Sequence, residues 1–146
     1  MVRPLQILPS DEPWVSWRPG VVTRLHSRAA AELCVFEQRL VPGASAPTHT
    51  HFAIEEMVVV LSGSAEVWVD GVHGSLESGE SILFPPHSWH GFRNSGADEL
   101  RTLAIFASAL PLVEYEEDPG VVLEIGASGD RKVDAHRSHR GEVGPT

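Results

Sequence analysis

The sequence predicts an all-β protein, a sandwich or a barrel, from two observations. Short runs rich in β-branched and aromatic residues alternate with turn signals along most of the chain. Glycine and proline are frequent, with 13 and 11 of 146 residues, as in turn-rich β proteins. Helical periodicity is short wherever it occurs, so Ser27–Leu33 and Ala109–Glu117 are each predicted to form a turn or two of helix at most.

The predicted strands follow one another with short polar connections. They are Val21–Leu25, Leu33–Val41, Glu56–Leu61, Ala65–Val69, Ser81–Phe84, His90–Asn94 and Leu100–Phe106. Asp70 and Gly71 stand between two alternating runs, a pattern typical of a tight hairpin turn. Regularly spaced short strands of this kind favour a sandwich or barrel over a sheet with crossover helices.

Both ends of the chain differ from this middle part. Residues 1–20 contain four prolines and two tryptophans, Trp14 and Trp17, so we expect an N-terminal arm that packs on the barrel. Residues 21–126 form the predicted β-barrel domain. Residues 127–146 contain two valines as their only large apolar side chains, too few to offset the entropy of ordering, so we expect disorder there.

Composition and charge exclude several classes of protein. The formal net charge of −9 would repel nucleic acids and anionic membranes, so neither is an expected partner. One cysteine, Cys34, allows no internal disulfide and no cysteine-based zinc cluster. No apolar run reaches the length of a membrane span, and the first residues are too polar for a signal peptide, so we expect a cytoplasmic protein.

Five of the eight histidines, His49, His51, His73, His87 and His90, lie between residues 49 and 90, and the first two form a His-x-His pair. On an extended strand, His49 and His51 leave the same face, and the carboxylates Glu55 and Glu56 follow after a short gap. Two imidazoles and a carboxylate suit a first-row divalent metal. A lone His-x-His pair, however, more commonly marks a half-exposed strand.

A second segment, Gly79 to Asn94, strengthens the metal hypothesis because the two segments together resemble the paired motifs of the cupin superfamily. The first motif, Gly-x5-His-x-His-x4-Glu-x6-Gly, is matched by Gly43, His49, His51, Glu56 and Gly63. The second, Gly-x5-Pro-x-Gly-x2-His-x3-Asn, is matched by Gly79, Pro85, His90 and Asn94. One position departs from the pattern, because His87 stands where the family has glycine.

The resemblance covers roughly residues 21–107 and implies a cupin-type double-stranded β-helix, a small jelly-roll barrel. It also implies four metal ligands: His49, His51, Glu56 and His90. His87 either adopts a left-handed turn, which histidine tolerates better than most residues, or adds a proton-transfer group at the mouth of the site. Glu55 is expected to face outward or to act at the mouth, so His87 and Glu55 are the candidate catalytic residues.

Four such ligands leave two octahedral positions for water, dioxygen or a chelating substrate. Strand parity places an apolar and aromatic lining beside them. The expected lining residues are Gln38, Phe36, Val58, Trp68, Phe84 and Phe92, although each aromatic side chain also suits the barrel core. Fe²⁺ or Mn²⁺ is favoured as the metal, with Ni²⁺, Zn²⁺ or Cu²⁺ as alternatives.

The leading functional hypothesis is a metal-dependent, dioxygenase-like oxygenase for a small, fairly apolar substrate that chelates through oxygen atoms. The alternatives are an isomerase, cyclase, lyase or decarboxylase that uses the metal as a Lewis acid, and a non-enzymatic binding protein. Small cupins are often dimers, so a homodimer is also expected. Trp14 and Trp17 suit either such an interface or closure of their own barrel.

Overall fold

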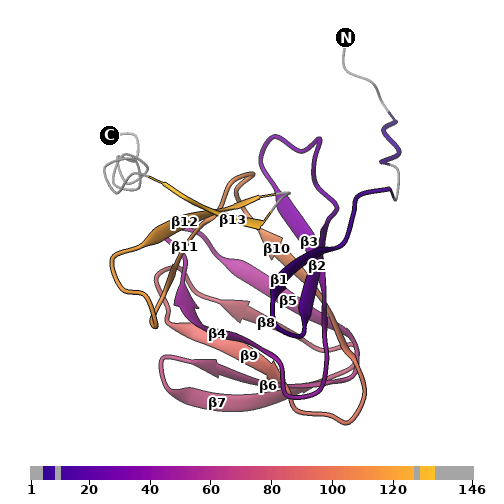
Figure 1. Cartoon of the computed structure of the whole chain (residues 1–146), viewed down its shortest axis with the longest axis vertical. Coiled ribbons are helices and arrows are strands. Elements are labelled where there is room, and N and C mark those ends of the chain that lie inside the picture. Colours follow the sequence, from indigo (N-terminus) through magenta and orange to yellow (C-terminus); the bar gives the residue numbers. More distant parts are fainter. Residues whose placement is uncertain (1–4, 9–10, 127–128, 134–146) are drawn as a thin grey trace.

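The computed structural model describes residues 5–8, 11–126 and 129–133, and these residues fold into two antiparallel sheets that face each other (Figure 1). The strands are β1 Val15–Arg18, β2 Val21–Leu25, β3 Cys34–Leu40, β4 Ser45–Thr50, β5 Glu56–Ser62, β6 Ser64–Val69, β7 Val72–Glu77, β8 Ser81–Phe84, β9 His90–Asn94, β10 Leu100–Phe106, β11 Leu112–Tyr115, β12 Val122–Gly126 and β13 Gly129–Lys132. The all-β prediction is therefore confirmed.

The first sheet has the strand order β1-β2-β3-β10-β5-β8, and the second has the order β13-β12-β11-β4-β9-β6-β7. Consecutive strands repeatedly cross from one sheet to the other, as from β3 to β4 and from β4 to β5 (Figure 1). This alternation produces the jelly roll that the sequence motifs implied. None of the described residues forms a helix that qualifies as a candidate membrane span.

The core lies between the two sheets and follows from the period-two alternation of each strand. Strand β10 is the clearest example, because every second side chain from Leu100 to Phe106 is buried. Its inward residues pack against those of β3 and β5, which flank it on either side. The largest buried apolar side chains include Leu40, Phe84 and Leu100.

The turn predicted at Asp70 and Gly71 is present. Val69 pairs with Val72, and the two residues between them have positive φ angles of 47° and 81°. Positive φ at both central positions defines a type I′ turn, whose twist matches that of the two strands it connects. The Asp70 side chain also accepts a hydrogen bond from the backbone N–H of Trp89 at 2.9 Å, which joins this turn to the start of β9.

The prediction of helical turns was wrong for both short segments. Residues 27–33 form bends and turns, and Leu112–Tyr115, within the second segment, forms strand β11. Tertiary pairing decides the second case, because β11 lies between β4 and β12 and hydrogen-bonds to both. Alternate residues of β11, Val113 and Tyr115, face the interior.

Both predicted end segments contain a strand. In the expected arm, β1 pairs with β2, and Trp17 packs against the core of its own barrel. In the segment expected to be disordered, Gly129–Lys132 forms β13 and pairs with β12, so the expectation does not hold for these four residues. Backbone pairing orders them without requiring large apolar side chains. The remaining residues of that segment, apart from Val133, lie outside the described residues.

Candidate metal centre

A bulge in β4 aims the first histidine into the barrel. Ala46 pairs with Phe92 and His49 pairs with His90. Between these two pairs, β4 therefore has one residue more than β9. This extra residue reverses the strand parity, and Ala46 and His49 are both buried on the inner face although they are three positions apart. Pro47 lies within the bulge, where its missing N–H removes no regular ladder bond.

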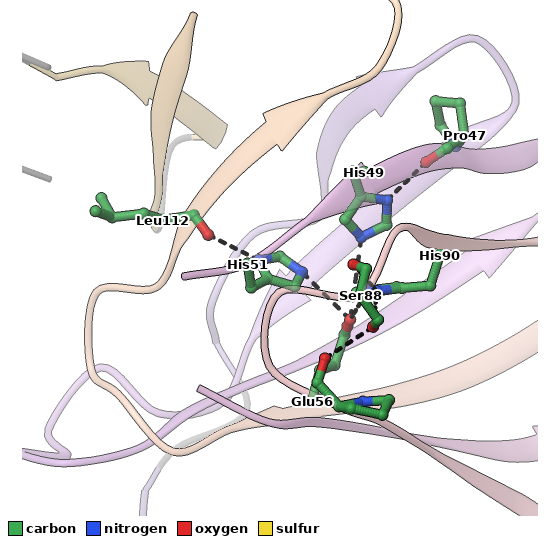
Figure 2. A network of polar contacts seen from close by, with 8 residues as sticks. Pro47, His49, His51, Glu56, Ser88, His90 and Leu112 are labelled. Carbon is green, nitrogen blue, oxygen red and sulfur yellow. Dashed lines mark hydrogen bonds and ion pairs between the residues drawn. The ribbon is translucent and has the colours of Figure 1, made fainter. Parts of the chain in front are cut away.

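The four residues that the motifs implied as ligands come together in the interior (Figure 2). Their potential ligand atoms all lie within 4.8 Å of one another, and each residue is at most 5% exposed. The Glu56 Oε1 atom lies 3.0 Å from His90 Nε2, 3.3 Å from His51 Nε2 and 4.0 Å from His49 Nε2. Three imidazole nitrogens therefore converge on one carboxylate oxygen.

Backbone carbonyls hold all three rings in one tautomer. The Nδ1 atom of His49 lies 2.6 Å from the Pro47 carbonyl, and that of His51 lies 2.7 Å from the Leu112 carbonyl (Figure 2). His90 Nδ1 lies 3.0 Å from the carbonyl of Ser88. A carbonyl only accepts hydrogen bonds, so each Nδ1 carries the proton and donates. Each Nε2 is then the ring nitrogen that faces the centre of the cluster, where it could coordinate an ion.

Burial makes this cluster electron-rich at neutral pH. Desolvation, together with the neighbouring His51 and His90, lowers the pKa of His49 to about 3, so its ring is neutral. Burial by itself would raise the pKa of Glu56, but its contacts with His51 and His90 hold that pKa below its usual range. Imidazole nitrogens around an ionised carboxylate are the donor set of a divalent metal site.

The residues present fit such an ion. His51 Nε2 is buried and has no hydrogen-bond partner among the described residues, although burial of an unpaired polar atom is costly. A cation at the centre of the cluster would give this lone pair a partner. Thiolates are absent from the described cluster, which contains imidazole and carboxylate only, and this suits a catalytic or binding metal better than a closed structural zinc site.

Aromatic side chains fix the orientation of the imidazole rings. The Phe84 ring stacks on His90 with a centroid distance of 4.0 Å and an interplanar angle of 10°. The Phe106 ring meets His51 edge to face at 4.8 Å. Rings held in this way cannot rotate without disturbing the core, so the cluster is preorganised.

The candidate catalytic residues His87 and Glu55 lie elsewhere. His87 is exposed, has a φ of 62° and donates its backbone N–H to the His51 carbonyl at 3.0 Å. This is the left-handed turn expected from its position in the motif. Glu55 is exposed and precedes the inward-facing Glu56, so it points to the opposite side. Neither residue lines the cavity beside the cluster, and the structure gives no support for a catalytic role of either.

That cavity lies between the two sheets, and His49, His51 and Glu56 form part of its wall. Of the residues expected to line it, Phe36, Gln38 and Phe92 do so. Val58 and Phe84 are instead packed in the core. Trp68 lies apart from the cavity, where its Nε1–H donates to Thr48 Oγ1 at 2.9 Å and its ring stacks on His73.

Several lining residues were not predicted because they lie in unpredicted strands. Trp17 comes from β1, Val113 and Tyr115 from β11, and Ile125 from β12. The alternation in Leu112–Tyr115 was the one signal that could have identified part of this wall. The second sheet thus contributes more of the cavity than strand parity in the middle of the chain suggested.

The cavity is narrow and has no cationic side chain. Its volume is about 30 Å³, which leaves room for water beside the cluster. The described lining residues include no lysine and no arginine. The arginine nearest in sequence to the lining residue Trp17 is Arg18, which stacks on Tyr115 and pairs with Glu117 at 2.8 Å.

Two facing sheets that enclose three converging imidazoles and a carboxylate define a jelly-roll barrel with a metal-binding capacity. The family model described as Cupin domain matches residues 36–106, which contain all four cluster residues. The chain is therefore a cupin-domain protein, as its motifs indicated.

Curated relatives include enzymes and a binding protein. Gentisate 1,2 dioxygenase 1 of Aquipseudomonas alcaligenes is 35% identical over 68 residues, which are 47% of this chain and 20% of that protein. Auxin-binding protein 1 of Arabidopsis thaliana is 28% identical over 119 residues, covering 73% of this chain and 59% of that protein. The chain spans between about a fifth and three fifths of the length of the curated relatives it matches.

Solved structures share the fold. A cupin-superfamily protein of Silicibacter pomeroyi described as a sugar phosphate isomerase has a TM-score of 0.64 and 21% identity, covering 81% of this chain and 78% of its own. KdgF of Halomonas sp. has a TM-score of 0.61 and 21% identity, covering 68% and 90%. At this level of identity, the likeness establishes the jelly-roll architecture alone.

Proposed function

We propose that the chain binds one divalent transition metal through His49, His51, Glu56 and His90 and acts as an oxygenase on a small, fairly apolar substrate that chelates through oxygen. One observation carries the proposal: three Nε2 atoms converge on a carboxylate at the wall of a largely apolar cavity. Fe²⁺ or Mn²⁺ suits this donor set best. When bound, such an ion supplies a Lewis-acidic centre with positions left for dioxygen and substrate.

The chain's own groups would prepare that centre. The carbonyls of Pro47, Ser88 and Leu112 keep the Nε2 lone pairs available. Phe84 and Phe106 restrain the rings, so ligand geometry does not have to be organised when the ion arrives. The apolar lining excludes bulk water, which strengthens electrostatic interactions at the centre.

The cavity also favours an oxygenase over sugar phosphate chemistry. Two curated relatives are named gentisate 1,2-dioxygenases, whereas a structural neighbour is described as a sugar phosphate isomerase. A phosphate dianion requires cationic or backbone N–H partners. The described lining contains neither lysine nor arginine, so an apolar substrate with oxygen ligands fits better.

A second candidate function is non-enzymatic binding of a small molecule. It is favoured by the likeness to auxin-binding protein 1, which extends over 73% of this chain. The same cluster and cavity would then hold a metal and a ligand without turnover. Dioxygen consumption separates the two functions.

The first test is the metal content of protein purified without chelators, measured by elemental mass spectrometry. Wild type is expected to contain iron or manganese near one equivalent, and His49→Ala is expected to lose it. His73→Ala is the matched control, because His73 is an exposed histidine on β7 that lies outside the cluster. Equal metal in wild type and His49→Ala would contradict the proposed site.

The second test measures dioxygen uptake by the iron-loaded protein with a panel of small hydroxy-aromatic acids that includes gentisate. The oxygenase proposal expects uptake with at least one acid and none with His49→Ala. Turnover that continues under anaerobic conditions would instead indicate Lewis-acid chemistry. Ligand binding without turnover would indicate the binding function.

A further inference from the structure

Gln38 is a buried polar group of β3 that the metal cluster does not use. Its side chain is 97% buried, since the residue is 3% exposed, and it lines the same cavity as His49 and Glu56. Its carboxamide makes no hydrogen bond to any other described residue. A carboxamide on the wall of a cavity can bind water there in the free protein, and the polar atom of a ligand that enters the cavity can take the place of that water.

The carboxamide belongs to a row of polar side chains across the first sheet. Gln38 is paired in register with Thr23 of β2 on one side and with Thr102 of β10 on the other. Thr23 also lines the cavity. Thr102 is fully buried, and its hydroxyl has no hydrogen-bond partner among the described residues. The inward-facing neighbours of Gln38 along β3 are Phe36 and Leu40, so the row is a polar band in an apolar wall.

Gln38 and the metal cluster lie at different ends of the cavity. Glu56 is aligned with Phe106 on β10, whereas Gln38 is aligned with Thr102. The two positions on β10 differ by four residues, about 13 Å along the strand at 3.3 Å per residue. The cavity therefore joins a metal-binding end to a hydrogen-bonding end through a stretch walled by Phe36 and Phe92.

We propose that Gln38 is a ligand-recognition residue that hydrogen-bonds a neutral hydroxyl or carbonyl oxygen at the end of the substrate remote from the metal. This inference rests on the proposed function, because the near end of the same substrate would bind the metal. The remote group is neutral because the described lining has no cationic side chain to balance a second carboxylate or a phosphate. A carboxamide both donates and accepts, so it serves a hydroxyl or a carbonyl.

Thermal unfolding of the metal-free protein tests the assignment without any ligand. Gln38→Leu keeps the volume of the side chain and removes the unpaired amide, so its Tm is expected to equal or exceed that of wild type. Thr102→Val is the control, because it removes the unpaired hydroxyl that does not line the cavity. A Tm several degrees lower for Gln38→Leu would show that the amide serves folding and would overturn the assignment.

Ligand binding tests the selectivity. Manganese-loaded protein is titrated calorimetrically with 2-oxo acids of three to six carbons, each with and without a terminal hydroxyl. At one chain length, the hydroxyl is expected to tighten binding by roughly three- to tenfold, as one net hydrogen bond does. Gln38→Leu should abolish this gain, whereas Thr102→Val should retain it. Dicarboxylic acids of the same length should bind more weakly than the hydroxylated acids.

Three results would overturn the inference: no gain at any length, a gain that survives in Gln38→Leu, or a preference for the dicarboxylic acids. Failure of all the acids to bind the manganese-loaded protein would count against it equally. If wild type takes up no manganese, the proposed function fails, and the Tm comparison alone decides whether Gln38 is a folding or a recognition residue. The two failures are therefore distinguishable.

Discussion

At the scale of single residues, Gly91 shows how tightly the second sheet is packed behind the cluster. A Cβ atom at this position would lie 2.6 Å from the Ala46 carbonyl oxygen and 2.6 Å from Cζ2 of Trp68. The first contact is with backbone of β4, next to the bulge that aims His49, so it cannot relax by a simple side-chain rotation. We therefore expect Gly91→Ala to lower the free energy of unfolding by about 1–3 kcal/mol, measured by chemical denaturation.

Gly74→Ala is the matched control for that variant. Gly74 is also a strand glycine, but a Cβ there would meet its nearest atom, Val67 Cγ2, at 3.8 Å, an ordinary contact. The control should be neutral or stabilising by up to about 1 kcal/mol, because alanine restricts the unfolded chain. Equal destabilisation by both variants would show that the loss of glycine flexibility, and not the close approach at Gly91, matters.

The cupin motifs predict the ligand residues themselves but not the groups that hold those residues in place. The spacing of histidines and glutamate predicted which side chains meet, because strand parity and family spacing both depend on local sequence. The carbonyl partners of the rings could not be predicted in this way, since His51 bonds to Leu112, which is 61 positions away. Asn94 matches a motif position, and its role is structural: Nδ2 donates to the carbonyls of Leu40 and Asp98.

At the scale of elements, β3 and β10 are joined by an ion pair on the outer face of the first sheet. Arg101 of β10 donates to Glu37 Oε1, and His26 Nε2 lies 3.5 Å from Glu37 Oε2. Burial alone would raise the pKa of Glu37, but the hydrogen bond and charge of Arg101 lower it. The folded state therefore keeps this carboxylate ionised at a pH where the unfolded chain has bound a proton.

The stability contribution of Glu37 should consequently be present above about pH 4.5, the ordinary glutamate value, and be lost as the pH falls through the lowered pKa. We expect Glu37→Gln to lower the unfolding free energy by roughly 1 kcal/mol at pH 7 and by less at pH 3. Denaturation curves at several pH values measure this difference. Glu99→Gln, at an exposed glutamate just before β10, is the control and should change the free energy of unfolding little. A Glu37 effect that is constant with pH would contradict the interpretation.

A strand could be predicted where its own residues alternate clearly between apolar and polar side chains. Strands β2, β8, β9 and β10 have the bounds that their residue patterns predict. Strands β11 and β12 were not predicted, although Val113, Tyr115, Val122 and Ile125 have high β propensity. Pairing of β11 with β4 and β12 fixes these segments as strands. Part of the cavity wall was unforeseen for the same reason, including the side chains of Val113, Tyr115 and Ile125.

At the scale of the whole molecule, the cluster ties the two sheets together. Glu56 belongs to β5 of the first sheet, whereas His49 and His90 belong to β4 and β9 of the second (Figure 1). An ion held by these residues would bind the folded state and not the separated strands, so binding must stabilise the assembled barrel. At a free metal concentration of 100 times Kd, the added stability would be about 2.7 kcal/mol.

For a chain of this length, that stabilisation corresponds to an increase in Tm of roughly 5–10 °C. Manganese added to chelator-treated wild type should therefore raise Tm by this amount, as measured by calorimetry, and a chelator should reverse the increase. Glu56→Gln should remove most of it, because an amide oxygen lacks the charge that balances the ion. Glu55→Gln is the control, since the exposed Glu55 lies outside the cluster and its loss should leave the increase unchanged. A Tm increase that persists in Glu56→Gln but not in Glu55→Gln would mean that the ion binds at the rim of the barrel and does not join its two sheets.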